Sequence, residues 1–456
     1  MDSRVKSRHS GHRFAWPLAA ALALLGARAA AAPEAGGTYE SLPTLKASDF
    51  LDAALLKGAN YEVQEKVTND GFFNTYTIDS PYGPFQPKST SLARIRVHEM
   101  DAIAQLKDVD KIAVAAGAAI NSVVDMGKGT YHLITNPVET AEGIGGAASR
   151  LFGRIGRSIK RSREKMDSAS EADKSTGTRV AETSQSVAKS LFGVNRALRA
   201  WAERLYVDPY THNEVLRNEL QEVADYDAGG RFSTKIVPVG VVGTVLGSVS
   251  TVNSLVYSKE PDEIQTLNET RLKAMGVTPE DSSAFRFNPH YTLMVQTSLV
   301  ASLDTLPDAT GRPEYVAQAA TAAAEVDARF FQENAYMVEL FNKQEAPVLG
   351  IAPDLPGACV IAKNDRFACL YSVDYVVWTE TVAGNASKVD DYVRAKHPKA
   401  TRELWLTGRV SPRTAQELQA RGWVVREKAM TVLPAMPVRP TPTPALEAQT
   451  QTPEAK

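Results

Sequence analysis

Cys359 and Cys369 are the two cysteines of the chain, and they carry its most specific chemistry. The stretch 358–372 reads as strand, turn and strand, with the turn at 363–365. A three-residue loop pairs the two cysteines across the strands, where Cβ atoms lie about 4.5–5.5 Å apart, close to disulfide reach. The first 32 residues have the pattern of an export signal, described below, and thiols oxidise outside the cytoplasm. We therefore predict a disulfide between the two cysteines. Two buried, reduced thiols are the alternative interpretation.

The other residues that could do chemistry are scattered along the chain. The five histidines after residue 32 have no metal-ligand spacing, and no phosphate-binding, dinucleotide-binding, nucleophile-elbow or zinc-protease motif occurs. We therefore predict no metal and no cofactor, and the catalytic residues of an enzyme would be unknown. The alternative function is a secreted hydrolase that needs no cofactor. Its site would be assembled across the fold from residues such as His212, Asp225, His290 and Asp304.

The first 32 residues have the pattern of a secretory signal peptide. Four basic residues precede an Ala/Leu-rich run at 14–25, and a run of four alanines ends at Pro33. An uncleaved membrane anchor is the competing interpretation. The apolar run is short and is broken by Pro17 and Gly26, which disfavours an anchor. We predict cleavage near Ala32 and a periplasmic or secreted protein. Two later segments, 150–165 and 236–258, bear on whether this protein also associates with a membrane.

The balance of charge excludes one class of partner. Residues 33–456 carry 46 basic and 52 acidic residues, a net charge of −6. General nucleic-acid binders are normally strongly positive, so we predict no nucleic-acid partner. The oligomeric state cannot be read from the sequence.

One segment has the opposite charge. Residues 150–165 carry seven cations against Glu164, a net charge of +6, around an apolar stripe that includes Leu151 and Phe152. A basic amphipathic helix is typical of contact with an anionic membrane surface or an acidic partner, such as another envelope protein. A solvated helix that leads into the linker at 167–178 is the alternative, and it is favoured because runs of charge are usually plain surface. The predicted contact residues are Arg150, Arg154, Arg157, Lys160 and Arg161.

The segment Ile236–Ser258 contains no charged residue over 23 positions. This length would allow a membrane span, but Pro238, Asn253, three glycines and several Ser and Thr residues argue against one. A buried element of the folded core is the favoured interpretation, and contact with a membrane is the alternative. The basic segment keeps that alternative open, because a reversible membrane binder needs both charge and apolar surface.

Local patterns predict the elements that would position these residues. A β-hairpin is expected at 61–78 around the Asp70-Gly71 turn, followed by a helix capped by Ser89 or Thr90. Thr211 begins a capping box for a further helix, and 315–343 reads as one long Ala-rich helix. Strand 403–406, a helix capped by Ser411 and strand 423–425 form a βαβ unit. The polar side of the helix after Ser89 is expected to be solvated and carries Arg94, Arg96, His98 and Glu99.

These patterns predict an α+β fold with an N-terminal β-hairpin plus helices, a helical middle, and a C-terminal mixed β region with one βαβ unit. The leading functional interpretation is an exported bacterial envelope protein without catalytic activity, which binds a partner or an anionic membrane surface. The predicted organisation is a signal peptide (1–32), hairpin and helices (33–146), basic helix and linker (147–178), a mainly helical domain (179–345), an α/β region (346–432) and a disordered Pro/Thr-rich tail (433–456).

Overall fold

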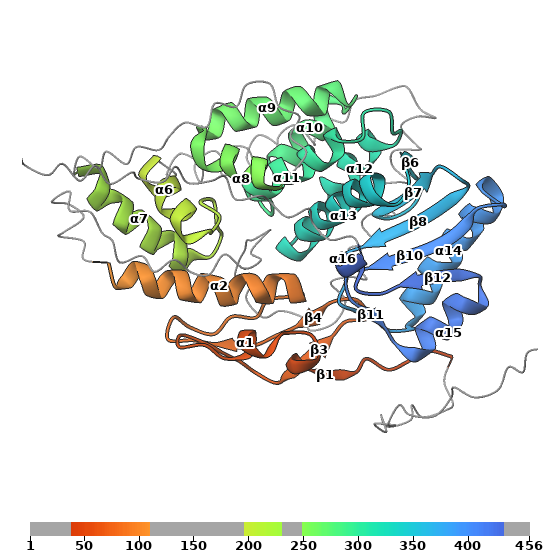
Figure 1. Ribbon diagram of the computed structural model, residues 1–456, viewed down its shortest axis with the longest axis horizontal. Coiled ribbons are helices and arrows are strands. Elements are labelled where there is room, and N and C mark those ends of the chain that lie inside the picture. The colour runs from red at the N-terminus through yellow and green to blue at the C-terminus, as the bar shows by residue number, and fades with distance from the viewer. Residues whose placement is uncertain (1–37, 110–195, 230–248, 433–456) are drawn as a thin grey trace, which may run out of the picture. The chain divides into compact units, whose positions relative to one another are not determined.

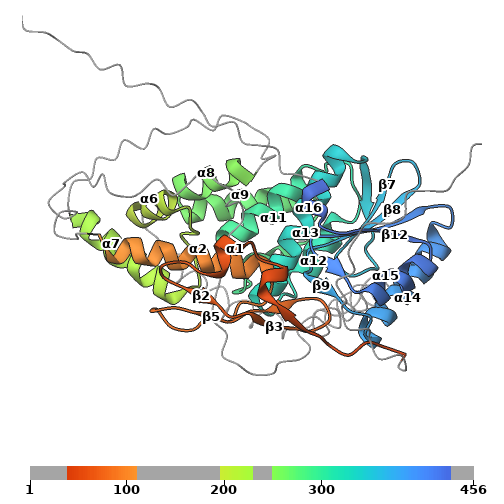
Figure 2. The same ribbon diagram turned by 60° about the horizontal axis from the view of Figure 1, so that its bottom comes forward.

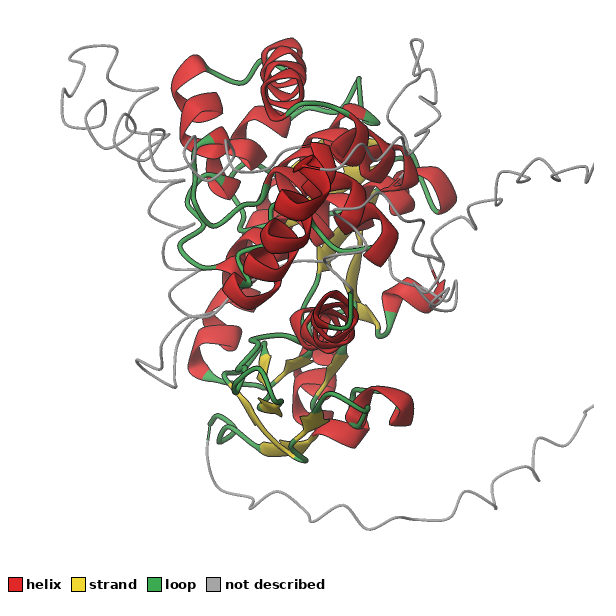
Figure 3. Cartoon of the chain, turned by 90° about the vertical axis from the view of Figure 1, so that its left-hand side faces the viewer, coloured by secondary structure: helices red, strands yellow, loops and turns green. Residues whose placement is uncertain are grey.

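The computed structural model describes residues 38–109, 196–229 and 249–432, and its secondary structure is 52% helical and 16% strand (Figure 1). Strands at the two ends of the described chain enclose a helical middle, so the predicted α+β class is confirmed. Figure 3 shows the strands in yellow and the helices in red. The predicted domain boundaries around 147–178 fall outside the described residues and stay predictions.

The N-terminal part consists of short strands and one long helix. Its three-stranded antiparallel sheet has the order β1-β3-β4, and β2 pairs with β5. The elements are β1 (Thr44–Lys46), η1 (Ala47–Asp49), α1 (Ala53–Leu56), β2 (Glu62–Val63), β3 (Lys66–Asn69), β4 (Asn74–Thr75), β5 (Ile78–Asp79) and α2 (Thr90–Lys107). The Ser89 hydroxyl accepts the Leu92 N–H at 3.1 Å, which confirms Ser89 as the cap of α2.

The turn between β3 and β4 differs from the predicted one by one position. The Asp70 N–H donates to the Phe73 carbonyl at 3.1 Å, so Gly71 and Phe72 are the two central residues. Gly71 has a φ of +100°, which fits a turn that needs positive φ at its first central position. The Asp70 carboxylate accepts the N–H groups of Phe72 and Phe73, and Asp70 therefore holds the turn from its first position.

The helical middle corrects two predictions. Residues 315–343 form two helices, because backbone groups between 320 and 324 are bonded by side chains, one from a distant segment and one from the first turn of the second helix. The Asn288 amide donates to the carbonyls of Ala320 and Ala322, and Asp327 accepts the Ala323 N–H. The helices are α6 (Arg196–Leu205), α7 (Glu214–Gly229), α8 (Val249–Ser258), α9 (Pro261–Ala274), α10 (Pro279–Arg286), α11 (Leu293–Asp304), α12 (Arg312–Ala319) and α13 (Glu325–Gln344).

The second correction concerns the start of α7. The Asn213 side chain accepts the Leu216 N–H at 3.3 Å, so Asn213 is the capping residue. The Thr211 hydroxyl instead donates to Glu99 on α2 at 3.0 Å. A capping box at Thr211 was therefore wrong, because its hydroxyl is used in a contact between distant segments.

The C-terminal part is a five-stranded mixed sheet with the order β12-β10-β8-β7-β6. Strands β8, β10 and β12 are parallel, which confirms the predicted βαβ unit, and Ser411 caps α15 as expected. The elements are β6 (Val348–Ile351), β7 (Ala358–Ala362), β8 (Arg366–Tyr371), β9 (Tyr375–Val376), α14 (Glu380–Lys396), β10 (Thr401–Leu406), β11 (Arg409–Val410), α15 (Pro412–Ala420), β12 (Trp423–Arg426) and α16 (Ala429–Val432).

Buried apolar side chains form two clusters. One cluster packs the helices from α9 through α13 against the C-terminal sheet and includes Phe331, Phe341 and Trp405. The other joins the N-terminal strands and α2 with α6, α7 and α8, and includes Trp201 and Leu220. Helix α2 contributes to both clusters, so it connects the two cores.

Candidate functional site

The two cysteines lie at disulfide distance in the predicted register. Cys359 on β7 faces Cys369 on β8, with a Cα–Cα distance of 4.0 Å. Both side chains are buried, and the Tyr371 hydroxyl lies 3.0 Å from the Cys359 sulfur. The spacing of the turn was the signal, because it sets which residues of the two strands face each other. This pair lies between neighbouring strands of the sheet, inside its packed core.

A buried ionic centre lies where solvated surface was expected on α2. Arg96 donates to Glu99 at 2.9 Å and to Glu325 of α13 at 3.0 Å, and all three side chains are at least nine-tenths buried. His98 is also buried, and its Nε2 lies 2.9 Å from the Leu205 carbonyl oxygen. Burial lowers the pKa of His98 below its usual value. The predicted solvated face is therefore wrong, apart from Arg94, which is exposed.

The corner between α6 and α7 completes this centre. Glu99 accepts hydrogen bonds from the Thr211 hydroxyl at 3.0 Å and the Asn213 amide at 2.8 Å. In the same corner the Asp208 carboxylate accepts the Tyr210 N–H and the Thr292 hydroxyl, at 2.8 and 2.5 Å. Each carboxylate oxygen of Glu99 and Asp208 thus has a donor. These contacts fasten α2, the corner and the start of α11 to one another.

The structure brings two of the four hydrolase candidates together. His212 and His290 influence each other electrostatically, and both are partly buried. Burial, with contributions from His290, Arg96 and Arg217, lowers the pKa of His212 to about 3. A base of this pKa is almost wholly unprotonated near pH 7 but too weak to remove a proton efficiently, because an efficient general base has a pKa near the working pH.

The two carboxylates of the hydrolase hypothesis belong to other contacts. Asp304, at the end of α11, pairs with Arg271 at 3.3 Å. Asp225 lies on the exposed side of α7 and accepts a hydrogen bond from Gln221 at 2.6 Å. The four candidates therefore do not form a single acid–base arrangement.

A second buried polar centre lies at the carboxyl ends of the parallel strands, where α/β proteins commonly bind ligands. Asp374 follows β8, and its carboxylate accepts the Asn74 N–H at 2.8 Å and the Thr90 N–H at 3.0 Å. Glu333 of α13 accepts hydrogen bonds from Ser91 and Ser372 nearby. Burial, reinforced by Glu333, raises the pKa of Asp374 to about 6.

Asp374 therefore links the N-terminal part of the chain to the C-terminal sheet. Both of its oxygens hold backbone amides of the N-terminal part, and its own N–H donates to the Phe72 carbonyl at 2.9 Å. Glu40 makes a similar contact, because it accepts the Trp378 N–H and the Ser411 hydroxyl. The chain's own N-terminal segment thus occupies the sheet edge at which a ligand would be expected.

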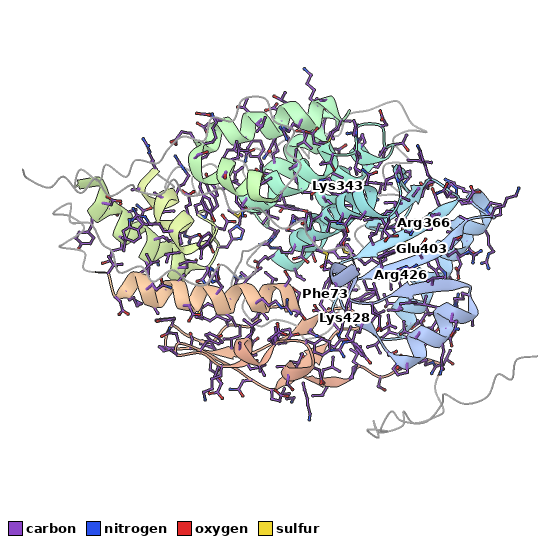
Figure 4. All side chains as sticks on the ribbon, in the orientation of Figure 1. Phe73, Lys343, Arg366, Glu403, Arg426 and Lys428 are labelled. Atoms are coloured by element: carbon purple, nitrogen blue, oxygen red, sulfur yellow. A yellow bond between two sulfur atoms is a disulfide. The ribbon has the colours of Figure 1, made fainter. Side chains whose placement is uncertain are left out.

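The C-terminal sheet carries a group of charges around Glu403, which is itself buried. Figure 4 shows Arg366, Glu403 and Arg426 next to one another on β8, β10 and β12. Arg366 donates to both oxygens of Glu403 at 2.6 and 2.8 Å, and Arg426 lies 3.7 Å from the same carboxylate. Arg366 also pairs with Glu345, and Lys343 with Glu339. Each of these three cations has an acidic partner, so this group gives no net positive surface.

Helices α2, α6 and α7 form a bundle. The described chain stops or begins at the end of α2, the start of α6 and the end of α7, and these three points lie at the same end of the bundle. Near the corner, Glu99 contacts Asn213; further along, Lys107 pairs with Glu219, so α2 and α7 run in the same direction. Helix α6 runs the opposite way, because Leu205 meets His98 while Trp201 donates to Asp227 at 3.2 Å. The end of α2, the start of α6 and the end of α7 therefore point the same way. We call this region the exit end; Figures 1 and 2 show it beside the label of α7.

The predicted contact residues Arg150, Arg154, Arg157, Lys160 and Arg161 lie outside the described residues, as does the stretch 236–248 of the uncharged segment. The remainder of that segment is α8, in which Val252, Leu255 and Val256 are buried in the core. Within the ranges that the structure describes, none of the helices has the length and apolar character needed to cross a bilayer.

Comparison with known proteins found no matching family model, no matching curated protein and no matching solved structure.

Proposed function

We propose that the protein is an exported envelope protein without catalytic activity, which binds an anionic membrane surface through the basic segment 150–165. An acidic envelope protein is the other partner that the charge of this segment would suit. The observation that carries the proposal is the separation of charge: this segment has a net charge of +6, while residues 33–456 as a whole have −6. A basic amphipathic sequence of this kind suits contact with anionic lipids.

The polar centres of the described chain support a role other than catalysis. The carboxylates of Glu99, Asp208 and Asp374 each accept a hydrogen bond from a separate segment of the chain, from Thr211, Thr292 and Asn74 respectively. His212 is a weak base, and Asp304 and Asp225 lie in other contacts. The buried polar chemistry is used to hold the fold together, which favours a binding protein over the hydrolase alternative.

The positions of the chain exits support a membrane over an acidic protein. Residues 110–195, which contain the basic segment, leave from the end of α2 and return at the start of α6. Residues 230–248, which contain most of the uncharged segment, leave from the end of α7. Both segments therefore have a junction with the bundle at this end, and a reversible membrane binder combines charge with apolar sequence.

Vesicle sedimentation tests the proposal. We expect the protein without residues 1–32 to sediment with vesicles that contain phosphatidylglycerol at low salt. The triple substitution R154Q, R157Q and K160Q should abolish sedimentation and leave the melting temperature nearly unchanged. A matched control removes the same charge from the C-terminal part through K363Q, K388Q and K399Q, three exposed lysines. Equal loss in both variants would mean that net charge alone decides binding, and would refute the assigned role of the basic segment.

A further inference from the structure

We propose that Trp378 and Ser411 form a binding site for an acidic residue in an extended segment of a partner protein, and that Glu40 of the same chain occupies this site as an internal competitor. The site lies where the chain that follows β9 meets the start of α15. This inference goes beyond the proposed function, because it uses none of the residues assigned to contact with lipid.

Three hydrogen bonds hold Glu40 in the site. The Trp378 N–H and the Ser411 hydroxyl donate to the same carboxylate oxygen, Oε2, at 2.8 and 2.5 Å. In return, the Glu40 N–H donates to the Trp378 carbonyl at 2.9 Å. The site therefore recognises both the backbone and the carboxylate of a single residue. Recognition of an extended peptide commonly combines backbone hydrogen bonds with a place for one side chain in this way.

The two donors to the carboxylate are built into the fold. Trp378 and Ser411 are 3% and 2% exposed. The Ser411 hydroxyl accepts the Thr414 N–H as the cap of α15, and the Ser411 N–H donates to the Val376 carbonyl. The position of Ser411 is thus fixed without Glu40. When Glu40 leaves, both donors lose an acceptor in a buried place, which is costly. A carboxylate from another segment would restore both bonds.

Glu40 belongs to a short strap, residues 39–42, whose apolar side chains gain little from the contact. Tyr39 is 43% exposed and Leu42 is 49% exposed. Strand β1 begins at Thr44 and pairs with β3, so the strap can move without loss of that pairing. Figure 1 shows the chain before β1, in red, reaching the region of α15. Displacement of the strap exposes little additional apolar surface, which favours exchange with a competing segment.

The charges around the site suit an acidic ligand. The Arg421 guanidinium lies over the Trp378 ring, 5.2 Å from its centre. Arg421 and Arg402 both pair with one acid, Asp390, at 3.1 and 3.5 Å. Glu427 also lies in this region, where it accepts a backbone N–H of β11. The two arginines outnumber the acid that they share, and a bound carboxylate would balance the second cation.

Peptide binding tests the proposal. The probe is a fluorescent peptide with the sequence of residues 38–44 and blocked ends, and fluorescence polarisation follows its binding to the protein without residues 1–32. We expect the variant E40A to bind this peptide. The wild type should bind it at least about tenfold more weakly, because the tethered Glu40 competes at an effective concentration on the order of millimolar. A peptide with Gln in place of Glu should bind E40A at least about tenfold more weakly, because it lacks the charged acceptor.

Further variants separate the site from other effects. E280A removes an exposed carboxylate on α10 and should bind the peptide no better than the wild type does. The addition of S411A to E40A removes one donor and should weaken peptide binding by about tenfold, with circular dichroism to check that the variant is folded. E40Q also lacks the carboxylate, and it takes the place of E40A if E40A does not fold.

The outcomes are distinct. Absence of peptide binding by both E40A and E40Q would overturn the proposal, as would equal affinity of E40A and the wild type, or of the Glu and Gln peptides for E40A. Sodium acetate, compared with sodium chloride, provides a free carboxylate. A higher melting temperature of E40A in acetate, without peptide binding, would indicate a site for a small carboxylate and would refute a partner segment. These measurements involve no lipid, so a failure of the proposed membrane contact would not affect them.

Discussion

Replacement of Asp374 by Ala should destabilise the protein by an amount that depends on pH. The carboxyl group joins the N-terminal part to the sheet by accepting two backbone N–H groups, of Asn74 and Thr90. The variant leaves both donors without an acceptor in a buried place. An unsatisfied buried donor costs about 1–3 kcal/mol, so the combined loss at low pH is about 2–6 kcal/mol.

The pH dependence follows from the burial of Asp374. Its pKa in the folded protein is about 6, compared with 3.8 for an unperturbed carboxyl group. The folded state therefore binds this proton more tightly than the unfolded state. Its contribution to stability is present in full below pH 4 and is lost as the pH rises to about 6. At about 1.4 kcal/mol for each pKa unit, the wild-type protein loses about 3 kcal/mol over this range, and the Ala variant does not.

Urea unfolding at pH 4.5 and pH 7.5 measures this difference. We expect the deficit of D374A relative to the wild type to be smaller at the higher pH by about 2 kcal/mol, because part of the loss has already occurred at pH 4.5. D374N is the control: it has no titrating group, so the difference between D374N and D374A should be the same at both pH values. A deficit of D374A that stays constant or grows with pH would refute the assignment of a raised pKa to this group.

Two further predictions concern processing and the cysteines. The exported protein should begin at or close to Pro33, which N-terminal sequencing would show; a chain that still starts at Met1 would contradict export through cleavage. Alkylation without reductant, followed by intact-mass analysis, should detect no free thiol, and two alkylated cysteines would restore the interpretation as reduced thiols.

Local patterns predicted the elements whose geometry is decided within a short stretch of chain. The pairing of Cys359 with Cys369 follows from the length of one turn, and the βαβ unit follows from a cap at Ser411 between two apolar strands. Turn length sets strand register, and a capping side chain starts a helix, so neither depends on distant residues.

The polar centres could not be predicted in this way. The spacing of apolar residues on α2 indicated one buried side, yet Arg96 and Glu99 are buried as well. Their partners, Glu325 and Asn213, lie more than 100 residues away, and nothing near Arg96 signals them. The break in 315–343 has the same origin. The Asn288 amide donates to the carbonyls of Ala320 and Ala322, which in a continuous helix would accept backbone N–H groups. In each case, contacts between distant segments overrode the local pattern.

The contact of the wild-type protein with lipid tests the central proposal most directly. The protein without residues 1–32 is mixed with vesicles of phosphatidylcholine alone or with added phosphatidylglycerol, and the sedimented fraction is measured as salt is raised. We predict binding to the anionic vesicles only, with loss of binding as the Debye length falls from about 30 Å at 0.01 M salt to about 8 Å at 0.15 M. Absence of binding to anionic vesicles at the lowest salt would contradict the account and leave 150–165 as ordinary solvated surface.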